Sequence, residues 1–269
     1  MKGKRVLVTG AGTGIGRGIA LEFAREGASV ALHASHSTAG AEEAAAEIRA
    51  SGGQAVVIGA DFARLDDVRE LARAAVSSLG GLDVLVNSAG ITMNREFEST
   101  STEQFEVLYA VNVRAPFFLT QAVLPSLLAS RGTVINISSV HAIGGRREHA
   151  VYAGTRGAIV SFTRSLAIEL APRGIRVNGI APGPVEVESY HKVLSGESIA
   201  RSAGCIPVGF LGQPSDVAKL AVFLASEAAR YVVGQTFVID GGTTAWFSLC
   251  DSFRDPTPVR FGEEYIPAS

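Results

Sequence analysis

The fold is decided near the N-terminus, where the apolar run Val6-Leu7-Val8 leads into Thr9-Gly10-Ala11-Gly12-Thr13-Gly14-Ile15-Gly16. A helical pattern with Ile19 and Phe23 on one face follows at once. Glycines between a strand and a helix let backbone N–H groups approach a pyrophosphate, which the positive end of the helix also favours. This context predicts a dinucleotide-binding loop rather than a plain glycine turn. No Gly-Lys-Ser/Thr sequence follows the glycines, so a nucleotide-hydrolysing loop is disfavoured.

Short runs rich in β-branched residues alternate with longer helical patterns along the rest of the chain. These runs fall at residues 5–9, 29–34, 55–59, 83–87, 133–138, 175–180 and 236–239. Each is mostly apolar, which is typical of strands covered by helices on both faces. The alternation itself indicates repeated βαβ units. The sequence therefore predicts an α/β fold with a single-domain, Rossmann-type, doubly wound parallel sheet of about seven strands with helices on both faces.

The overall composition favours a globular protein that handles small molecules. Of the 269 residues 47% are hydrophobic, and 24 basic against 26 acidic residues leave a formal net charge of −2. This balance gives no general electrostatic reason to bind nucleic acid or an anionic membrane. No uninterrupted apolar stretch approaches the ~18 to 20 residues of a membrane span, and the start does not read as a signal peptide.

The two cysteines, Cys205 and Cys250, are too far apart for a C-x-x-C pair, and no histidine cluster accompanies them. We therefore expect no metal site and a reducing, cytoplasmic location. Lysine is scarce: only four of the 24 basic residues are lysines, and none lies between residues 5 and 191.

The end of the second predicted strand is where the adenosine ribose of a dinucleotide is usually read. An acidic residue there favours NAD, because it holds the 2′-hydroxyl. The stretch His33-Ala34-Ser35-His36-Ser37-Thr38 has none, and offers small hydroxyl donors and two imidazoles to a 2′-phosphate instead, without the arginine that usually accompanies one. We expect NADP, with NAD as the alternative; a polar surface turn that discriminates between neither is the competing interpretation.

Several motifs appear in order along the chain: Thr9-Gly10-x-x-x-Gly14-x-Gly16, Asp61, Asn87-Ser88-Ala89-Gly90, Asn112, Ser138-Ser139, Tyr152, Pro182-Gly183 and Asp240-Gly241-Gly242. Thirteen positions separate Ser139 from Tyr152. In this order the chain resembles the short-chain dehydrogenase/reductase family from about residue 4 to residue 244. The resemblance implies catalytic roles for Asn112, Ser139, Tyr152 and Arg156. It implies cofactor contacts from Gly10, Gly12, Thr13, Gly14, Ile15, Gly16, Ser35, Asp61, Phe62, Asn87, Ala89, Gly90, Tyr152, Arg156, Pro182, Gly183 and Val185.

The implied reaction explains these residue types. Hydride transfer to a ketone builds negative charge on the carbonyl oxygen, which then needs a hydrogen-bond donor and an acid. Tyr152 would be that acid, or the base in alcohol oxidation, and Ser139 the second donor. Asn112 resembles the asparagine that keeps a water chain connected to a lysine, which lies four residues after the tyrosine in the family.

The sequence departs from the family pattern at that lysine, since arginine occupies position 156. Arginine keeps the positive charge and can donate to ribose hydroxyls, but it does not readily release a proton. Three accounts follow: an enzyme that takes its proton from water or solvent, a slow enzyme, or a catalytically impaired dinucleotide-binding protein acting as redox sensor or scaffold. We favour the enzyme. A second departure lies at Val187. Family members often carry a threonine there, which holds the nicotinamide carboxamide. The backbone groups of Val185 can hold the carboxamide instead.

The segment after Ser139 and the loop at residues 183–211 are expected to choose the substrate. The substrate candidates are His141, Arg146 and His149. Ser139-Val140-His141 and the aromatic stretch after Asp240-Gly241-Gly242 are similar to the glucose dehydrogenase branch, which implies a sugar or polyol. Arg146 and Arg147 instead fit an anionic carrier, as in the similar 3-oxoacyl-acyl carrier protein reductases. The simplest alternative for each of these side chains is a solvated loop. Glu186 and Glu188 are interpreted as solvated loop charges, with contact to a substrate hydroxyl as the alternative.

The resemblance also implies a homotetramer or homodimer, built from helices at about 102–129 and 152–170 whose apolar faces include Ala158, Ile159, Phe162 and Leu166. We divide the chain into a dinucleotide-binding catalytic domain at residues 1–244 and an aromatic-rich extension at 245–269. The extension holds Trp246 and several further aromatic residues, so it is expected to pack on a neighbouring subunit or over the substrate loop.

Overall fold

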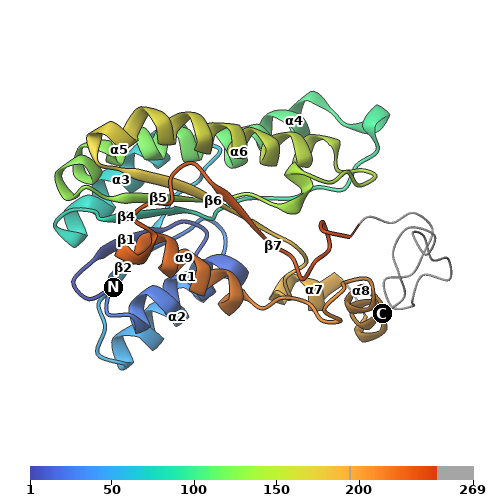
Figure 1. Ribbon diagram of the computed structural model, residues 1–269, viewed down its shortest axis with the longest axis horizontal. Helices are drawn as coiled ribbons and strands as arrows, with labels where there is room; N and C mark the ends of the chain where they lie inside the picture. Colours follow the sequence, from blue (N-terminus) through green and yellow to red (C-terminus); the bar gives the residue numbers. More distant parts are fainter. Residues whose placement is uncertain (194, 247–269) are drawn as a thin grey trace, which may run out of the picture.

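Seven parallel strands form one sheet in the computed structural model, which describes residues 1–193 and 195–246 (Figure 1). The strand order is β3-β2-β1-β4-β5-β6-β7. The strands are β1 (Arg5–Val8), β2 (Ser29–Ala34), β3 (Ala55–Gly59), β4 (Val84–Asn87), β5 (Thr133–Ile137), β6 (Arg176–Pro182) and β7 (Thr236–Ile239). The predicted seven-stranded, doubly wound sheet is confirmed, and the strand ends differ from the expected ones by no more than two residues.

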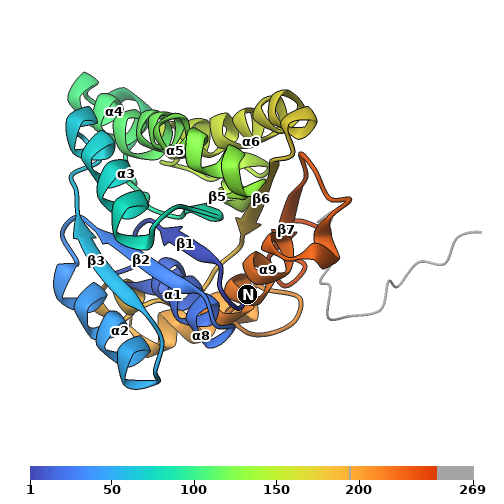
Figure 2. The same cartoon turned by 90° about the vertical axis from the view of Figure 1, so that its left-hand side faces the viewer.

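Helices cover both faces of the sheet (Figures 1 and 2). One layer holds α1 (Gly14–Arg25), α2 (Thr38–Ala50) and α9 (Pro214–Ala225), and the other holds α3 (Leu65–Leu79), α5 (Ala115–Ser130) and α6 (Ala150–Leu170). The shorter helical elements are η1 (Phe97–Ser99), α4 (Thr102–Tyr109), η2 (Ala110–Arg114), η3 (Val140–Ala142), η4 (Ala171–Arg173), α7 (Glu188–Val193), α8 (Gly196–Gly204) and η5 (Glu227–Ala229). Both α7 and α8 lie beyond the end of the sheet, between β6 and α9 (Figure 1).

The two-residue period of the strands divides the core into two halves. In β1, Val6 and Val8 pack with Phe23 of α1, whereas Leu7 points to the other face and packs with Leu119 of α5. All five side chains are fully buried. Burying a large apolar side chain stabilises the folded state by about 2 to 3 kcal/mol. The apolar residues on both faces of the strands therefore contribute directly to the stability of the fold.

The continuous helical stretch Thr102–Ser130 is long and apolar enough to cross a membrane by length and composition alone, with a mean hydropathy of 1.3. Its α5 part places Leu119, Val123 and Leu127 in the core against α3 and the sheet. The α5 part of the stretch is therefore packed as a core helix of an α/β domain.

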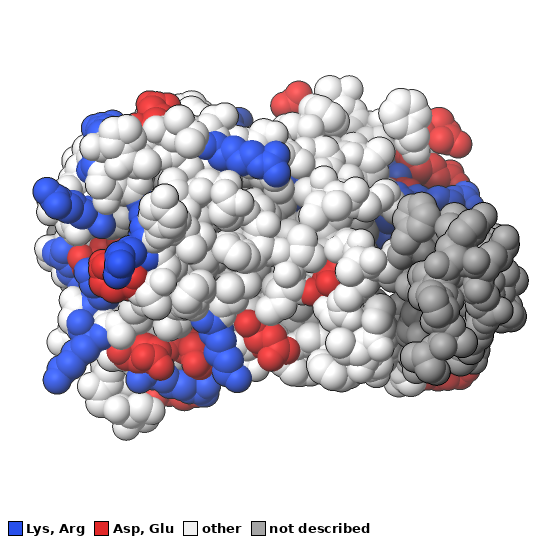
Figure 3. All heavy atoms as spheres, viewed as in Figure 1, with Lys and Arg blue, Asp and Glu red and all other residues white. Residues whose placement is uncertain are grey.

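Charged side chains are mixed on the face shown in Figure 3, where Lys and Arg are interspersed with Asp and Glu. This face presents no extended field of one sign, in agreement with the formal net charge of −2. Residues 247–269, on which the predicted packing of the aromatic extension depends, lie outside the described residues. Trp246 is described, and its backbone N–H donates to the carbonyl of Gly242 at 3.1 Å.

Candidate active site

The strand order reverses between β1 and β4, and the loops that follow these two strands meet there. Thr9 joins them, since its buried hydroxyl accepts hydrogen bonds from the backbone N–H groups of Ser88 and Ala89, both at 2.9 Å. The same hydroxyl lies 3.3 Å from the carbonyl of Val86, to which it donates. In open α/β sheets ligands bind at such a switch point, outside the carboxyl ends of the strands.

The glycine loop needs its glycines for specific reasons. Gly10 has a φ of +66°, and a Cβ there would lie 2.8 Å from the Cα of Ala89. A Cβ at Gly16 would collide with the carbonyl oxygen of Gly10, so helix α1 packs directly on its own preceding loop. The loop is therefore held close to both β4 and α1, with its backbone open toward the cleft.

A cleft of about 520 Å³ opens beside this loop. It brings together most of the predicted cofactor residues. They are Gly10, Gly12, Thr13, Gly14, Ile15, Gly16, Ser35, Asp61, Phe62, Ala89 and Gly90. At one end Asp61 is fixed because its Oδ1 accepts from the N–H of Ala63 at 2.9 Å.

His33 does not take the role that its sequence position suggested. Its Nδ1 lies 3.3 Å from the N–H of Gly10 and its Nε2 lies 3.0 Å from the carbonyl of Ala60. These partners assign the neutral tautomer in which Nδ1 accepts and Nε2 donates. Burial lowers the pKa of His33 to about 4, although the Ala60 carbonyl opposes the shift. The ring also stacks on Phe62, with centroids 4.3 Å apart.

The prediction that His33 accommodates a 2′-phosphate is therefore wrong. The side chain is 1% exposed and uncharged, and both ring nitrogens are used by the backbone. It braces the glycine loop against the segment that ends β3. Ser35 and His36, which follow β2, line this end of the cleft and are exposed.

Tyr152 and Arg156 lie one turn apart on α6. The guanidinium carbon of Arg156 lies 4.9 Å from the centroid of the Tyr152 ring. Its Nη1 donates to the carbonyl of Ile137 at 3.3 Å, and its Nη2 fills the space above Gly90. The arginine is only 7% exposed, and its Nε has no hydrogen-bond partner among the described residues. A buried cation thus lies on the tyrosine ring and beside the cofactor cleft.

Asn112 lies in the π-helical turn η2 and is almost completely buried. Its Nδ2 donates to the Ile91 carbonyl at 2.9 Å and to Thr155 Oγ1 at 3.1 Å, while its Oδ1 accepts from the N–H of Ile91. Both amide donors are thus used within the chain. The side chain ties the loop after β4 to the helix that carries Tyr152, and the π turn reroutes backbone bonding as such turns often do at functional sites.

Ser139 and two imidazoles complete this end of the site. Ser139 begins the turn η3, where its Oγ accepts from the N–H of His141 at 3.2 Å. The rings of His141 and His149 stack with centroids 4.8 Å apart. They meet the ring of Tyr152 edge-on at 5.7 and 6.1 Å. Burial, followed by the charges of His149 and Arg146, lowers the pKa of His141. Arg146 itself is exposed.

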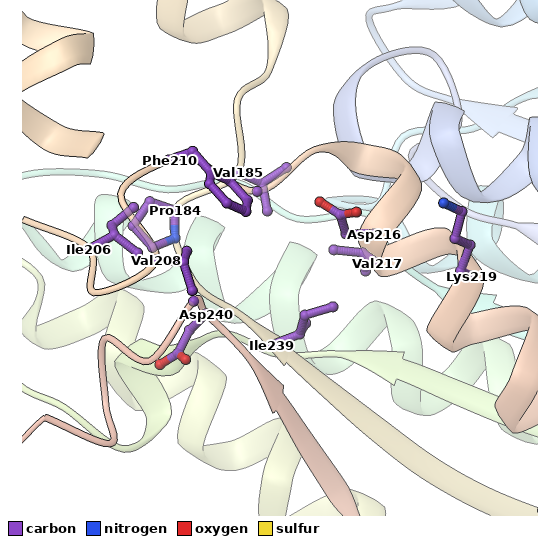
Figure 4. A pocket seen from close by; sticks show the side chains of 12 residues that line it. Pro184, Val185, Ile206, Val208, Phe210, Asp216, Val217, Lys219, Ile239 and Asp240 are labelled. Atoms are coloured by element: carbon purple, nitrogen blue, oxygen red, sulfur yellow. The ribbon is translucent and has the colours of Figure 1, made fainter. Parts of the chain in front are cut away.

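The six remaining predicted cofactor residues are not part of the lining of the cleft. Two of them, Tyr152 and Arg156, are described above. Asn87 is buried and donates to the side chains of Asn136 and Thr120. Pro182 ends β6, and Gly183 donates to the Ile239 carbonyl. Val185 lines a second cavity of about 360 Å³, whose mainly apolar walls come from the loop before α9, from α9 itself and from the end of β7 (Figure 4). The bridge between Val185 and Gly212 uses the neighbouring Pro184 carbonyl and Glu186 N–H rather than the groups of Val185.

Glu188 makes a contact that the sequence does not predict. Its side chain is exposed, as expected of a solvated loop charge, but its Oε2 also accepts a hydrogen bond of 2.9 Å from the N–H of Gly14. This contact spans 174 positions in the sequence, and no local pattern could have indicated it. The sequence places Thr9 only within the glycine motif. Its hydrogen bonds to the distant loop after β4 likewise become visible only in the fold.

The parallel sheet and the glycine-loop cleft at its switch point are those of a dinucleotide-binding protein of the doubly wound α/β class. Residues 10–244 match the family model described as enoyl-(acyl carrier protein) reductase. The 3-oxoacyl-[acyl-carrier-protein] reductase of Staphylococcus aureus is 39% identical over 240 residues, 89% of this chain and 97% of that protein. The L-rhamnose 1-dehydrogenase (NAD(P)(+)) of Azotobacter vinelandii is 40% identical over 245 residues, 89% of this chain and 96% of that protein.

Solved structures agree with these relatives. A dehydrogenase/reductase from Sinorhizobium meliloti superposes with a TM-score of 0.85 at 36% identity, covering 90% of this chain and 96% of that one. A 7α-hydroxysteroid dehydrogenase, solved with NADH and 7-oxo glycochenodeoxycholic acid, gives the same score and identity and covers 90% and 94%. The chain belongs to the short-chain dehydrogenase/reductase family. It is an oxidoreductase that moves a hydride between a nicotinamide dinucleotide and a CH–OH or keto carbon.

Proposed function

We propose that the catalytic group is formed by Ser139, Tyr152 and Arg156, with Asn112 as a positioning residue. The observation that carries this assignment is the buried guanidinium of Arg156 on the face of the Tyr152 ring, next to Gly90 of the cleft. A cation in this place favours a negative charge on the tyrosine during proton transfer. The family's lysine is thereby replaced in charge, although not in its ability to release a proton.

The residues around the cleft fit a dinucleotide. The glycine loop brings backbone N–H groups to the start of α1, where the carboxylate of Glu188 already stands in for an anion on Gly14. The buried Nε of Arg156, which has no hydrogen-bond partner in the described part of the chain, provides a further donor at the catalytic end. When bound, the nicotinamide supplies or accepts the hydride. We infer NADP as the preferred form because no acidic residue ends β2, and Ser35 and His36 are exposed there.

The chain's own residues handle the proton and the oxygen. Ser139 Oγ donates to the carbonyl oxygen of the substrate, and Tyr152 Oη gives the proton in reduction or takes it in oxidation. Arg156 stays charged throughout, so the proton on Tyr152 exchanges with solvent rather than through the guanidinium. Asn112 holds the loop after β4 against α6 and keeps Tyr152 in register with the cleft.

The favoured substrate is a sugar or polyol. His141 and His149 lie against Tyr152, and Nδ1 of His149 lies 2.8 Å from the carbonyl of Arg147. A ring nitrogen of an imidazole can donate to or accept from a substrate hydroxyl group. The similarity to L-rhamnose 1-dehydrogenase supports this class. A 3-oxoacyl group on an anionic carrier is the second candidate, because Arg146 and Arg147 are exposed in the same segment.

We also propose a homotetramer or homodimer, in which α5 and α6 form the contact. Phe117 on α5 is 46% exposed and Ile168 on α6 is 74% exposed, so these helices keep apolar surface outside the core. Ile159, which the sequence assigned to this face, is 2% exposed and packs within the chain instead.

We further propose a cytoplasmic location, a catalytic domain at residues 1–244 with the substrate loop at 183–211, and a C-terminal extension at 245–269.

The test is a steady-state panel of sugars and polyols in oxidation and of ketones and 3-oxoacyl thioesters in reduction, each with NADP(H) and NAD(H). Tyr152→Phe should abolish activity, and Arg156→Lys should keep or raise it. Losing a positioned proton donor typically costs about 10² to 10⁴-fold in rate. Parent activity that survives Tyr152→Phe would contradict the assignment. Activity found only in Arg156→Lys, with cofactor still bound by the parent, would mean that the natural chain keeps its ligand but lacks the proton relay.

A further inference from the structure

Helix α1 has no cap of its own at its N-terminus. Thr13 makes no side-chain capping bond, and the first turn contains no acidic residue. The first N–H groups of a helix have no partner within the helix and carry its positive end. In this chain the carboxylate of Glu188 supplies that partner, with its Oε2 2.9 Å from the N–H of Gly14.

The contact belongs to the substrate loop rather than to the glycine loop. Glu188 is the first residue of α7, and both Glu188 and Val187 line the dinucleotide cleft opposite the glycines. Val187 packs on Gly14: a Cβ added at Gly14 would lie 3.0 Å from the Cγ1 of Val187. The start of α7 is thus fastened across the cleft onto the start of α1.

The neighbouring carboxylate, Glu186, is engaged elsewhere. Its Oε2 accepts from Gln213 Nε2 at 2.9 Å, and its Oε1 lies 3.1 Å from His191 Nε2. These partners lie on the α9 side of the loop and on α7, away from the glycines. Two carboxylates only two positions apart therefore have different surroundings, and only Glu188 faces the place where a pyrophosphate is expected.

We propose that Glu188 is an internal competitor for the cofactor pyrophosphate and thereby links cofactor binding to the position of the substrate loop. This rests on the proposed use of the glycine loop as the pyrophosphate site. One N–H cannot donate fully to two anions, and a carboxylate beside a pyrophosphate is repelled by it. Dinucleotide binding must therefore displace Glu188, which releases the start of α7 from α1. Without cofactor the same contact holds the loop across the cleft.

The prediction concerns affinity for ligands that carry a pyrophosphate. Glu188→Gln removes the charge, and Glu188→Ala removes both the charge and the acceptor. An anion at a helix N-terminus contributes a modest free energy, so each variant should bind NADPH and ADP-ribose about three- to tenfold more tightly than the parent. Binding of 2′-AMP, which lacks the pyrophosphate, should not change. Glu186→Gln is the matched control and should bind all three ligands as the parent does.

Titration calorimetry on the full chain gives these dissociation constants, and thermal melting of each variant checks that it is folded. The proposal is overturned if both Glu188 variants bind NADPH no more tightly than the parent, or if Glu186→Gln shows the same gain. It is also overturned if 2′-AMP binding improves equally, because the effect would then be a general one of charge. A parent that binds neither NADPH nor NADH would refute the proposed function itself, whereas a parent that binds with no effect at Glu188 refutes only this inference.

Discussion

Acid should destabilise this protein through His33. The pKa of the buried imidazole is lowered to about 4, against an ordinary value of 6.5. Between these two pH values the unfolded chain binds a proton at this residue and the folded chain does not. Stability therefore falls as the pH drops from about 6.5 to about 4, and this contribution is constant below pH 4. The difference of about 2.5 pKa units corresponds to about 3 kcal/mol.

The assay compares urea unfolding of the parent and of His33→Gln at several pH values from 7 to 4, followed by circular dichroism at one protein concentration. The variant loses contacts to Gly10 and Ala60, so the parent should be the more stable at pH 7. That advantage should shrink by about 3 kcal/mol at pH 4, since only the parent carries the titrating group. His36→Gln, at an exposed imidazole, controls for the loss of a histidine as such. A stability difference between the parent and His33→Gln that stays constant with pH would show that His33 does not lose stability on protonation in this way.

Two further predictions concern the site and the assembly. Gly90→Ala should reduce kcat about 10²-fold while the protein stays folded, because the new Cβ would displace Arg156 Nη2 from the Tyr152 ring. The control is Gly145→Ala, since no atom lies within 4 Å of the Cβ position at Gly145. Equal activities of the two variants would contradict the prediction. Ile168→Glu should weaken self-association at least tenfold, because it places a charge at an exposed apolar position on α6. Light scattering over a dilution series measures the change in mass. An unchanged mass at every dilution would place the interface elsewhere.

Local sequence patterns predict most of the fold. Strands buried on both faces have a nearly continuous apolar sequence, so all seven could be located within two residues of their ends. The switch point also followed from sequence, because a glycine loop after the first strand is typical of this sheet topology. The short helices α7 and α8 carry no comparable signal, and they were covered only by a loop assignment at residues 183–211.

The site was predictable where its residues belong to motifs, and not where a contact joins distant segments. Tyr152 and Arg156 lie on one helix, so their spacing already placed them on one face. His33 had the right position but the wrong role, since only the fold shows that both ring nitrogens meet backbone groups. Glu188 could not be separated from Glu186 by sequence, because their difference lies in which distant element each one reaches.

The hydroxyl of Thr9 has a consequence for the folding of the chain. It joins residues 79 and 80 positions away, so the floor of the cleft exists only after β4 has paired with β1. A nascent chain that has formed β1, α1 and β2 already contains every glycine of the loop, yet lacks the loop's fixed geometry. Such long-range closures form late compared with helices. Dinucleotide affinity is therefore a reporter of tertiary assembly, and its recovery during refolding should follow the pairing of β1 with β4 rather than the appearance of helix.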